Sequence, residues 1–390
     1  MSRLWPVAVF AASLVIYVAT LPPDVLPGDS GELIAASYTL SIAHPPGYPL
    51  YVMAGKVFAS VVRLGSVAYR YNLLSAILAA LTSALVFLTA TRLRVPRLLA
   101  LAAALGLATT GAFWLQATTA EVYALNGLFT ALMFYMAVSA RPLGQRAFLL
   151  LGLVGGLAVS HHLSMAYALA GSLAVSIVGL GLAPRPRTVL LSALLFALGL
   201  TVWLYVPIRS AREPLLTWGD TARMGGFLSH VTAQGYKWRL RSPDLVARVL
   251  DWVGFFKVLA VSVGAPLAML AVLGAATSLR RRRMLAGFGL LLALFAFHYA
   301  VYNIPDIESH VFPAVVAVGV LAALGLDGIH RWTRLPRRAR WVAAAAGLAV
   351  VAVNLASIRP REDAWFARDY AEAIARSARE ACGEGCLIIT

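Results

Sequence analysis

The sequence predicts an all-α polytopic membrane protein, and three observations lead to this fold class. Of the 390 residues, 60% are hydrophobic and only 13% are charged, and the mean hydropathy is +0.78. An ordinary soluble domain has about a quarter of its residues charged. The apolar residues form stretches close to the ~20 residues that a helix needs to cross a bilayer, and arginines gather in the short segments between these stretches.

Eleven apolar stretches are candidates for membrane-spanning helices. The third and fifth are short, so either could thin the bilayer or form half of a re-entrant pair, and about eleven spans are expected. In chain order the stretches cover residues 4–21, 68–91, 98–113, 122–140, 147–160, 163–183, 188–208, 251–277, 284–302, 310–326 and 341–357.

The arginine clusters predict the orientation of these helices. They lie in alternate connections, whereas the connections around Glu121, His161 and Asp306 contain no Lys or Arg. The positive-inside rule therefore predicts a cytoplasmic N-terminus and an extracytoplasmic C-terminus. The clusters are Arg92, Arg94 and Arg97; Arg141 and Arg146; Arg185 and Arg187; Arg280 to Arg283; and Arg331, Arg334, Arg337, Arg338 and Arg340.

The net charge of +16 does not indicate a nucleic-acid-binding protein. The arginines are spread along membrane edges and form no single basic patch. We interpret them as topology signals that contact lipid headgroups, so the lipid bilayer is an expected partner and nucleic acid is not.

Two parts are expected along the chain: a transmembrane domain over residues 1–357 and an extracytoplasmic tail over 358–390. The tail ends in an apolar run and is expected to be the truncated start of a soluble domain. Its two cysteines, Cys382 and Cys386, could form a strained disulfide or stay as thiols.

Only two outer segments between spans are long, residues 22–67 and 209–250, so function is expected there. In the first, apolar stretches at 33–42 and 50–62 flank a Pro/Gly-rich turn. Two short interfacial helices broken by a rigid turn fit this pattern.

Asp29 and Glu32 stand at the start of the first interfacial stretch and have two interpretations. A spacing of three puts both carboxylates on one helix face, where they could share a proton, a metal or an attacking hydroxyl. Alternatively, Asp29 is a helix N-cap and Glu32 its capping-box partner.

The second long segment mixes bases with aromatic residues, which suits the gripping of a phosphate and a sugar ring. An aromatic belt at the membrane interface would explain its Trp and Tyr residues alone, but it explains Asp220 and His230 less well. The candidates here are Arg209, Trp218, Asp220, His230 and Lys237.

Shorter outer connections add further polar side chains. Each alone is best explained as a solvated loop residue or a cap, but together they predict one polar cavity at the outer face. A divalent metal bound by Asp29, Glu32, Glu121, His161 or Asp306 is conceivable, although no spacing specifies one and no cofactor is firmly implied. The further candidates are Glu121, Tyr123, Asn126, His161, His162, Asp306 and His310.

Two motifs in the first long segment resemble the signature of the domain of unknown function 2723 family, a branch of the GT-C membrane glycosyltransferases. They are Pro-Gly-Asp-Ser-Gly-Glu-Leu at 27–33 and His-Pro-Pro-Gly-Tyr-Pro at 44–49. The resemblance continues through residues 121–126, 161–164, 205–210, 217–220, 227–230 and Tyr236.

The resemblance implies a GT-C-like helix bundle and a membrane enzyme similar to protein O-mannosyltransferases. Such an enzyme moves a sugar, here expected to be mannose, from a polyprenyl-phosphate donor to a protein or glycan hydroxyl on the extracytoplasmic side. Asp29 fits the acidic residue of the first outer loop, with Glu32 beside it, and His44 and Tyr48 belong to the substrate-binding motif. Arg209, His230 and Lys237 are candidates to stabilise the departing phosphate. The inner membrane of a bacterium is the expected location.

Two other classes remain open at this stage. One is a polytopic transporter or lipid-linked sugar flippase, but such proteins usually place ionisable residues near the membrane midplane, and the predicted spans here are almost free of charge. The other is a catalytically inactive scaffold with the same fold, which the presence of both Asp29 and Glu32 disfavours.

Overall fold

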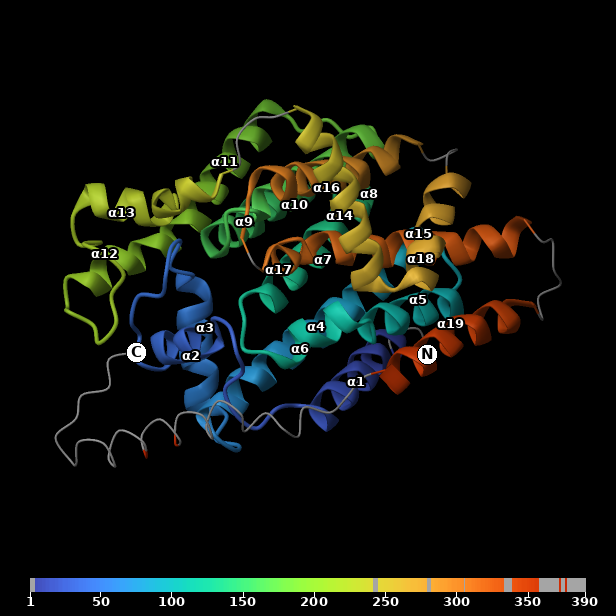
Figure 1. Cartoon of the computed structure of the whole chain (residues 1–390). Helices are drawn as coiled ribbons and strands as arrows, with labels where there is room; N and C mark the ends of the chain where they lie inside the picture. Colours follow the sequence, from blue (N-terminus) through green and yellow to red (C-terminus); the bar gives the residue numbers. More distant parts are fainter. Residues whose placement is uncertain are drawn as a thin grey trace.

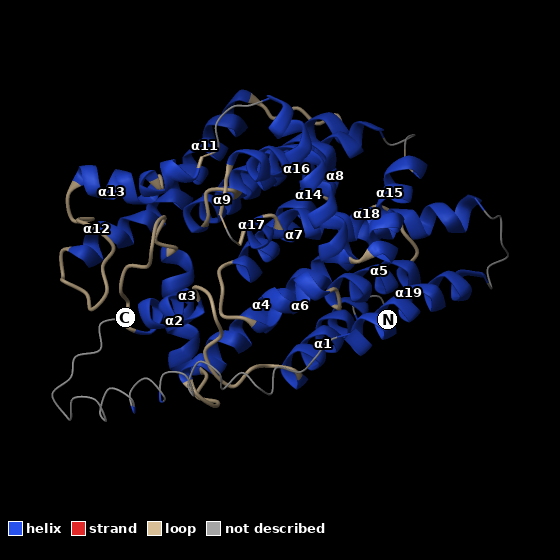
Figure 2. Ribbon diagram, viewed as in Figure 1, coloured by secondary structure: helices blue, strands red, loops and turns tan. Residues whose placement is uncertain are grey.

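A computed structural model describes residues 4–240, 245–278, 282–304, 306–332 and 339–357, together with Glu372 and Arg376. The described residues are helices joined by loops, with one isolated β-bridge between Leu240 and Tyr302 (Figure 2). The all-α prediction is therefore confirmed. The predicted tail at 358–390, with its two cysteines, lies outside the described residues apart from Glu372 and Arg376.

Long apolar helices form the body of the molecule (Figure 1). They are α1 (Leu4–Ala19), α4 (Val67–Arg92), α5 (Arg97–Ala108), α6 (Gly111–Thr118), α7 (Tyr123–Val138), α9 (Gln145–His161), α10 (Met165–Ala174), α11 (Pro186–Leu200), α14 (Leu245–Val263), α15 (Ala265–Thr277), α16 (Arg282–Val301), α18 (Phe312–Trp332) and α19 (Ala339–Ser357).

Further helices lie mainly at one end of this body. They are α2 (Ser30–Tyr38), α3 (Pro49–Val61), α12 (Tyr205–Ser210), α13 (Met224–Val231), the 3₁₀ helix η3 (Gln234–Arg239) and α17 (Ile307–His310), with α2, α3, α12 and α13 at the left in Figure 1. The pair α2 and α3 confirms the two short helices predicted on either side of the Pro/Gly-rich turn. Elsewhere, α8 (Ala140–Leu143), the π-helical turn η1 (Val175–Gly179) and the 3₁₀ turn η2 (Thr201–Leu204) complete the described elements.

Four of the described helices are by themselves long and apolar enough to cross a membrane: Val67–Arg92, Pro186–Ser210, Arg283–Val301 and Phe312–Arg331. Two bent pairs raise this number to six, and the remaining predicted spans correspond to shorter apolar helices. A multi-pass membrane protein is confirmed by these helices, whereas the count of eleven stays a prediction.

The stretch at 251–277 differs from the single span expected from its composition. It forms two helices, α14 and α15, and the chain direction bends by 118° between them. Gly264 at the break has φ +77°, a conformation that glycine adopts readily, and Pro266, two residues later, has no N–H to continue the hydrogen bonds of α14. The third predicted stretch, α5 with α6, is also bent, by 66°, in line with its expected irregularity.

Of the four helices long enough to cross a membrane by themselves, α18 is the most deeply buried, with 94% of its apolar window inside the protein. It packs closely on α15 because small residues face each other: a Cβ on Gly274 would lie 1.9 Å from the carbonyl oxygen of Leu321. In a bilayer no hydrophobic effect drives helices together, so they associate through close packing at small residues. By contrast, the span containing α11 is only 11% buried and exposes a leucine-rich face, as expected for contact with lipid.

Candidate functional site

A cavity of about 620 Å³ opens among the loops at the end of the body where α2, α3 and α13 lie. Its walls come from elements far apart in the sequence, so the fold brings together the separate outer connections. The lining residues are Asp29, Glu32, His44, Pro45, Pro46, Tyr48, Tyr123, His162, Leu163, Ser164, Tyr167, Trp218, Thr232, Ala233, Tyr236, Lys237, Arg239, Leu240, His298, Tyr302, Ile304, Asp306 and His310.

Asp29 occupies the N-cap position of α2, but its side chain makes no capping hydrogen bond. The carboxylate is instead half-exposed to the cavity, with 52% of its side-chain surface accessible. Glu32 does not complete a capping box either, because both of its oxygens accept hydrogen bonds from His44. The capping interpretation of this pair is therefore wrong for both side chains.

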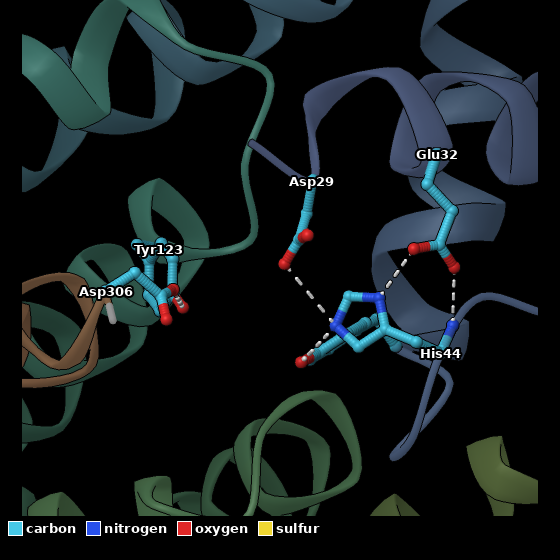
Figure 3. Close-up of polar contacts among 6 residues, drawn as sticks. Asp29, Glu32, His44, Tyr123 and Asp306 are labelled. Carbon is cyan, nitrogen blue, oxygen red and sulfur yellow. Dashed lines mark hydrogen bonds and ion pairs between the residues drawn. The ribbon is translucent and has the colours of Figure 1, made fainter. Parts of the chain in front are cut away.

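His44 joins the two carboxylates (Figure 3). Its backbone N–H donates to Glu32 Oε1 at 2.7 Å, and its Nδ1 lies 2.9 Å from Glu32 Oε2. A carboxylate only accepts, so Nδ1 carries a proton and Nε2 is turned toward Asp29 Oδ2 at 3.7 Å and the Tyr48 hydroxyl at 3.2 Å. Glu32 thus holds the imidazole in place and His44 presents Nε2 to Asp29.

The electrostatics of these three groups differ. Burial raises the pKa of Asp29; the attraction of His44 opposes this effect, and repulsion from Asp306 and Glu32 adds to it. Burial also acts to raise the pKa of Glu32, but the hydrogen bonds and charge of His44 outweigh it, so the pKa is lowered. For His44, burial is outweighed by Glu32 and Asp29, and the pKa is raised. Asp29 is consequently the more basic of the two carboxylates.

Tyr123 and Asp306 face Asp29 from across the cavity, as Figure 3 shows. The Tyr123 hydroxyl donates to Asp306 Oδ2 at 3.0 Å. Behind Asp29, the Glu121 carboxyl accepts hydrogen bonds from the backbone amides of Asp29 and Val122. Burial, followed by repulsion from Asp29 and Asp306, raises the pKa of Glu121 to about 8. Glu121 therefore fixes the backbone at Asp29 and does not line the cavity.

The cationic residues of the cavity come from η3. Lys237 and Arg239 are the lysine and arginine among the described lining residues. The segment is tied to the loop after α16, because Asn303 N–H donates to the Arg239 carbonyl at 3.0 Å and Leu240 forms a bridge with Tyr302. The Arg239 guanidinium packs over the Trp238 ring at 4.1 Å, and its buried Nε has no hydrogen-bond partner within the described chain.

Ten of the residues predicted from the sequence line this cavity: Asp29, Glu32, His44, Tyr48, Tyr123, His162, Trp218, Lys237, Asp306 and His310. Trp218 also donates to Glu32. The predicted cavity at the outer connections is thus present, and it gathers residues from every connection that the sequence singled out.

Six other candidates lie outside the lining: Glu121, Asn126, His161, Arg209, Asp220 and His230. The Arg209 guanidinium donates to the carbonyls of Leu40 and Thr39 at the end of α2. Asp220 pairs with Arg223 at 3.2 Å on the surface.

Asn126, His161 and His230 are buried beneath or beside the cavity and contribute to packing there. His161 Nε2 lies 3.1 Å from the Val122 carbonyl, and His230 Nε2 lies against Gly47.

Several lining residues were not among the candidates, namely Tyr167, Tyr236, Arg239, His298 and Tyr302. His298 and Tyr302 lie at the outer end of an apolar stretch, a position that is typical of residues at the membrane interface. Their relation to His310 depends on the turn between α16 and α17, which no local pattern encodes. The basic and aromatic run Tyr236–Arg239 did indicate a site, but the sequence analysis chose Lys237 from it and not Arg239.

Asp29, Glu32 and His44 also form a group whose possible metal-ligand atoms all lie within 4.8 Å of one another. Both Glu32 oxygens and His44 Nδ1 are already engaged with each other. A divalent cation bound by all three residues would have to displace these hydrogen bonds.

The sequence of this chain is similar to a family of protein O-mannosyl-transferases. Residues 29–179 match the family model described as the N-terminal domain of protein O-mannosyl-transferase TMEM260. The chain is 30% identical over 352 residues to the mouse protein O-mannosyl-transferase TMEM260, covering 82% of this chain and 49% of that protein. A Dictyostelium discoideum protein of the same name is 29% identical over 134 residues, covering 34% of this chain and 16% of that protein. The chain thus spans at most about half the length of these relatives.

The structure is similar to the crystal structure of apo ArnT from Cupriavidus metallidurans, with a TM-score of 0.60. The match covers 90% of this chain and 64% of ArnT at 16% sequence identity, so it concerns the fold. The predicted GT-C-like helix bundle is confirmed by this likeness. The chain is accordingly a GT-C-fold membrane protein that is related by sequence to an O-mannosyltransferase-like family.

Proposed function

We propose that this protein transfers a sugar, mannose in the first instance, from a polyprenyl-phosphate donor to an acceptor hydroxyl at the extracytoplasmic face. The observation that carries the proposal is the cavity itself: an accessible carboxylate, Asp29, is held beside the His44–Glu32 pair and shares the cavity with Lys237 and Arg239. The relation to O-mannosyl-transferases and the ArnT fold support the same reaction class.

Asp29 acts as the general base. The acceptor oxygen attacks the anomeric carbon, its proton passes to the Asp29 carboxylate, and the bond between that carbon and the phosphate oxygen breaks. The lipid leaves as a phosphate monoester. A base is most effective when its pKa approaches the working pH, and burial shifts the pKa of Asp29 in that direction.

Lys237 and Arg239 hold the phosphate and stabilise the charge that develops on it as the bond breaks. They take this role in place of Arg209, whose guanidinium is occupied by the carbonyls at the end of α2. Arg239 has a buried Nε free to donate, and a guanidinium can bind two phosphate oxygens at once.

The acceptor is a protein or a glycan, and it reaches Asp29 from the extracytoplasmic side, where the arginine-free connections are expected to lie. The N-terminus is cytoplasmic, and the protein belongs to the domain of unknown function 2723 branch in the inner membrane of a bacterium.

The test is a transfer assay with purified protein in nanodiscs, a radiolabelled polyprenyl-phosphate mannose and a hydroxyl-bearing peptide or glycan. Wild-type protein should form labelled product. Arg239→Ala should lower kcat/KM by about 10- to 100-fold, since a hydrogen bond to a charged group contributes about 1.5–3 kcal/mol.

The matched control is Arg212→Ala, because Arg212 is an exposed arginine of the same outer segment that does not line the cavity. Its activity should equal that of the wild type. Donor movement across the bilayer without any labelled product would instead indicate a flippase.

A further inference from the structure

We propose that one wall of the cavity is a subsite for the sugar ring of the donor and that it selects an uncharged, hydroxyl-rich ring. This inference rests on the proposed glycosyl transfer and specifies which part of the cavity binds and selects the sugar. The wall, called here the histidine wall, consists of His162, Tyr167, His298, Tyr302 and His310.

His310 is the centre of the histidine wall. Its ring lies 5.2 Å from the ring of His162, 5.6 Å from that of His298 and 5.8 Å from that of Tyr302. Tyr167 extends the wall, with its ring 5.9 Å from His298. Four segments supply these rings: the α9–α10 connection, α10, the end of α16 and α17. Aromatic surface with a few fixed polar groups is the usual lining of a small-molecule site.

The hydrogen bonds of the wall fix where its donors and acceptors point. His162 Nδ1 accepts the backbone N–H of Ser164 at 3.3 Å, so the proton of a neutral ring resides on Nε2. His298 Nε2 and His310 Nδ1 lie 3.4 Å apart, and one of them donates to the other. Each of the three rings therefore keeps a second nitrogen for another partner, and hydroxyl groups can serve as donor or acceptor to either form.

The wall is electrically neutral. Burial lowers the pKa of His162 well below its usual value, and the neighbouring His310 adds to this effect. Burial also lowers the pKa of His310, to about 3, and its contact with His298 disfavours a second charge there. The lining residues at 162–167 include no formally charged side chain.

Asp306 is the one carboxylate that the 298–310 segment adds to the lining, in the part of it that the structure describes. Its Oδ2 accepts the Tyr123 hydroxyl, which leaves Oδ1 to accept a sugar hydroxyl. With Asp29 and Glu32 in the same cavity, an acidic sugar would meet three carboxylates. A neutral ring with several hydroxyls is the ligand that matches this combination of uncharged rings and one acceptor.

The experiment measures dissociation constants of three lipids for purified protein in detergent: a short polyprenyl phosphate, its hexose ester and its hexuronic acid ester. In the wild type, the hexose ester should bind more tightly than the sugar-free lipid, and the hexuronic ester should not. His310→Ala should weaken the hexose ester by about tenfold, the loss of one to two hydrogen bonds, and leave the sugar-free lipid unchanged.

Tyr167→Leu should show the same pattern through loss of an aromatic surface, and it covers the case in which His310→Ala does not fold. The matched control is His330→Ala. His330 lies near the far end of α18, about 27 Å along the helix from its start beside His310, and should bind all three lipids as the wild type does.

Equal loss of affinity for the sugar-free lipid and the hexose ester in His310→Ala and Tyr167→Leu would overturn the sugar subsite while leaving the proposed function standing. Tight binding of the hexuronic ester would overturn the selection of an uncharged ring. If neither the sugar-free lipid nor the hexose ester binds to wild-type protein, the proposed function fails and the subsite fails with it.

Discussion

Among single residues, Asp29 and Glu32 illustrate how two carboxylates three positions apart acquire different tasks. Glu32 is engaged on both oxygens by His44, whereas Asp29 has no capping contact and is open to the cavity. The proposed roles, Glu32 as an orienting group and Asp29 as a base, rest on these partners, and the pKa directions agree with them.

Glu32→Gln should therefore slow transfer by about 10- to 100-fold, less than the loss expected for Asp29→Asn. An amide keeps the shape of the side chain but weakens the charge-assisted hydrogen bonds that position His44, each of which contributes about 1.5–3 kcal/mol. The kcat and KM of the purified variant measure this effect. A loss larger than that of Asp29→Asn would reverse the two roles.

Glu121 gives a prediction for the pH dependence of stability. Its pKa is raised from an ordinary 4.5 to about 8, so the folded state binds this proton more tightly than the unfolded state. The resulting stabilisation is full below pH 4.5 and is lost as the pH rises to about 8. Glu121→Gln should remove this loss, so the Tm of the variant minus that of the wild type should increase between about pH 5 and pH 8.5.

Glu213→Gln is the control for the loss of one carboxylate, since Glu213 is exposed and does not line the cavity. A Glu121→Gln difference that stays flat across the same range would show that the proton is not bound at this carboxyl.

The comparison between sequence and structure is most instructive for Asp29, Arg209 and Arg239. The motif predicted that Asp29 faces a site, because Asp29 and Glu32 follow an apolar span and a spacing of three puts both carboxylates on one helix face. It could not reveal that His44, 12 positions beyond Glu32, joins the two carboxylates. Nor could it separate Arg209 from Arg239, because each is a basic residue at a membrane edge and only the tertiary structure shows whose donors are free.

At the level of elements, the turn between α2 and α3 positions the site through a glycine. Gly47 has φ +92°, and a Cβ there would lie 2.9 Å from His230 Nε2. Gly47→Ala should destabilise the protein by about 1–3 kcal/mol, the usual cost of a strained backbone conformation, and should also reduce transfer because the same turn carries His44.

Gly225→Ala is the matched control, since a Cβ at Gly225 in α13 would meet nothing within 4 Å. It should leave the apparent Tm unchanged or slightly raised, because alanine favours a helix over glycine by about 0.5–1 kcal/mol. Equal stability of the Gly47→Ala and Gly225→Ala proteins would contradict the proposed role of the turn.

The helices themselves were predictable to different degrees. Apolar length sufficed to place α4, α16 and α18, whose sequences are continuous hydrophobic runs. The sharp bend between α14 and α15 was not anticipated, because mean hydropathy is insensitive to a single Gly and Pro within an apolar stretch. The turn residues at 45–49 were recognisable as a break since prolines and glycine disfavour helix strongly.

Across the whole molecule, the distribution of histidine and arginine separates the two ends. Four of the seven histidines, His44, His162, His298 and His310, line the cavity. The positive-inside rule predicts that this end faces the extracytoplasmic side and that the arginine-bearing connections face the cytoplasm.

This orientation can be tested by cysteine labelling after Cys382 and Cys386 are replaced by Ser. The exposed Arg63, in the first long outer segment, and the exposed Ala183, in an arginine-bearing connection, each receive one cysteine. An impermeant maleimide added to intact cells should label Arg63→Cys, and it should label Ala183→Cys only after the membrane is opened. Labelling of both from the same side would refute the predicted topology.

The central claim is that the Asp29 carboxylate accepts the proton of the acceptor hydroxyl, and Asp29→Asn tests it most directly. The substitution keeps the size of the side chain, and Asp29 makes no capping hydrogen bond that could be lost, so folding should be preserved. We expect a Tm no lower than that of the wild type, unchanged donor affinity and a sugar-transfer rate lowered by about 10²- to 10⁴-fold, the usual contribution of acid–base catalysis. Purified Asp29→Asn protein that transfers sugar at the wild-type rate would contradict the assignment of Asp29 as the base.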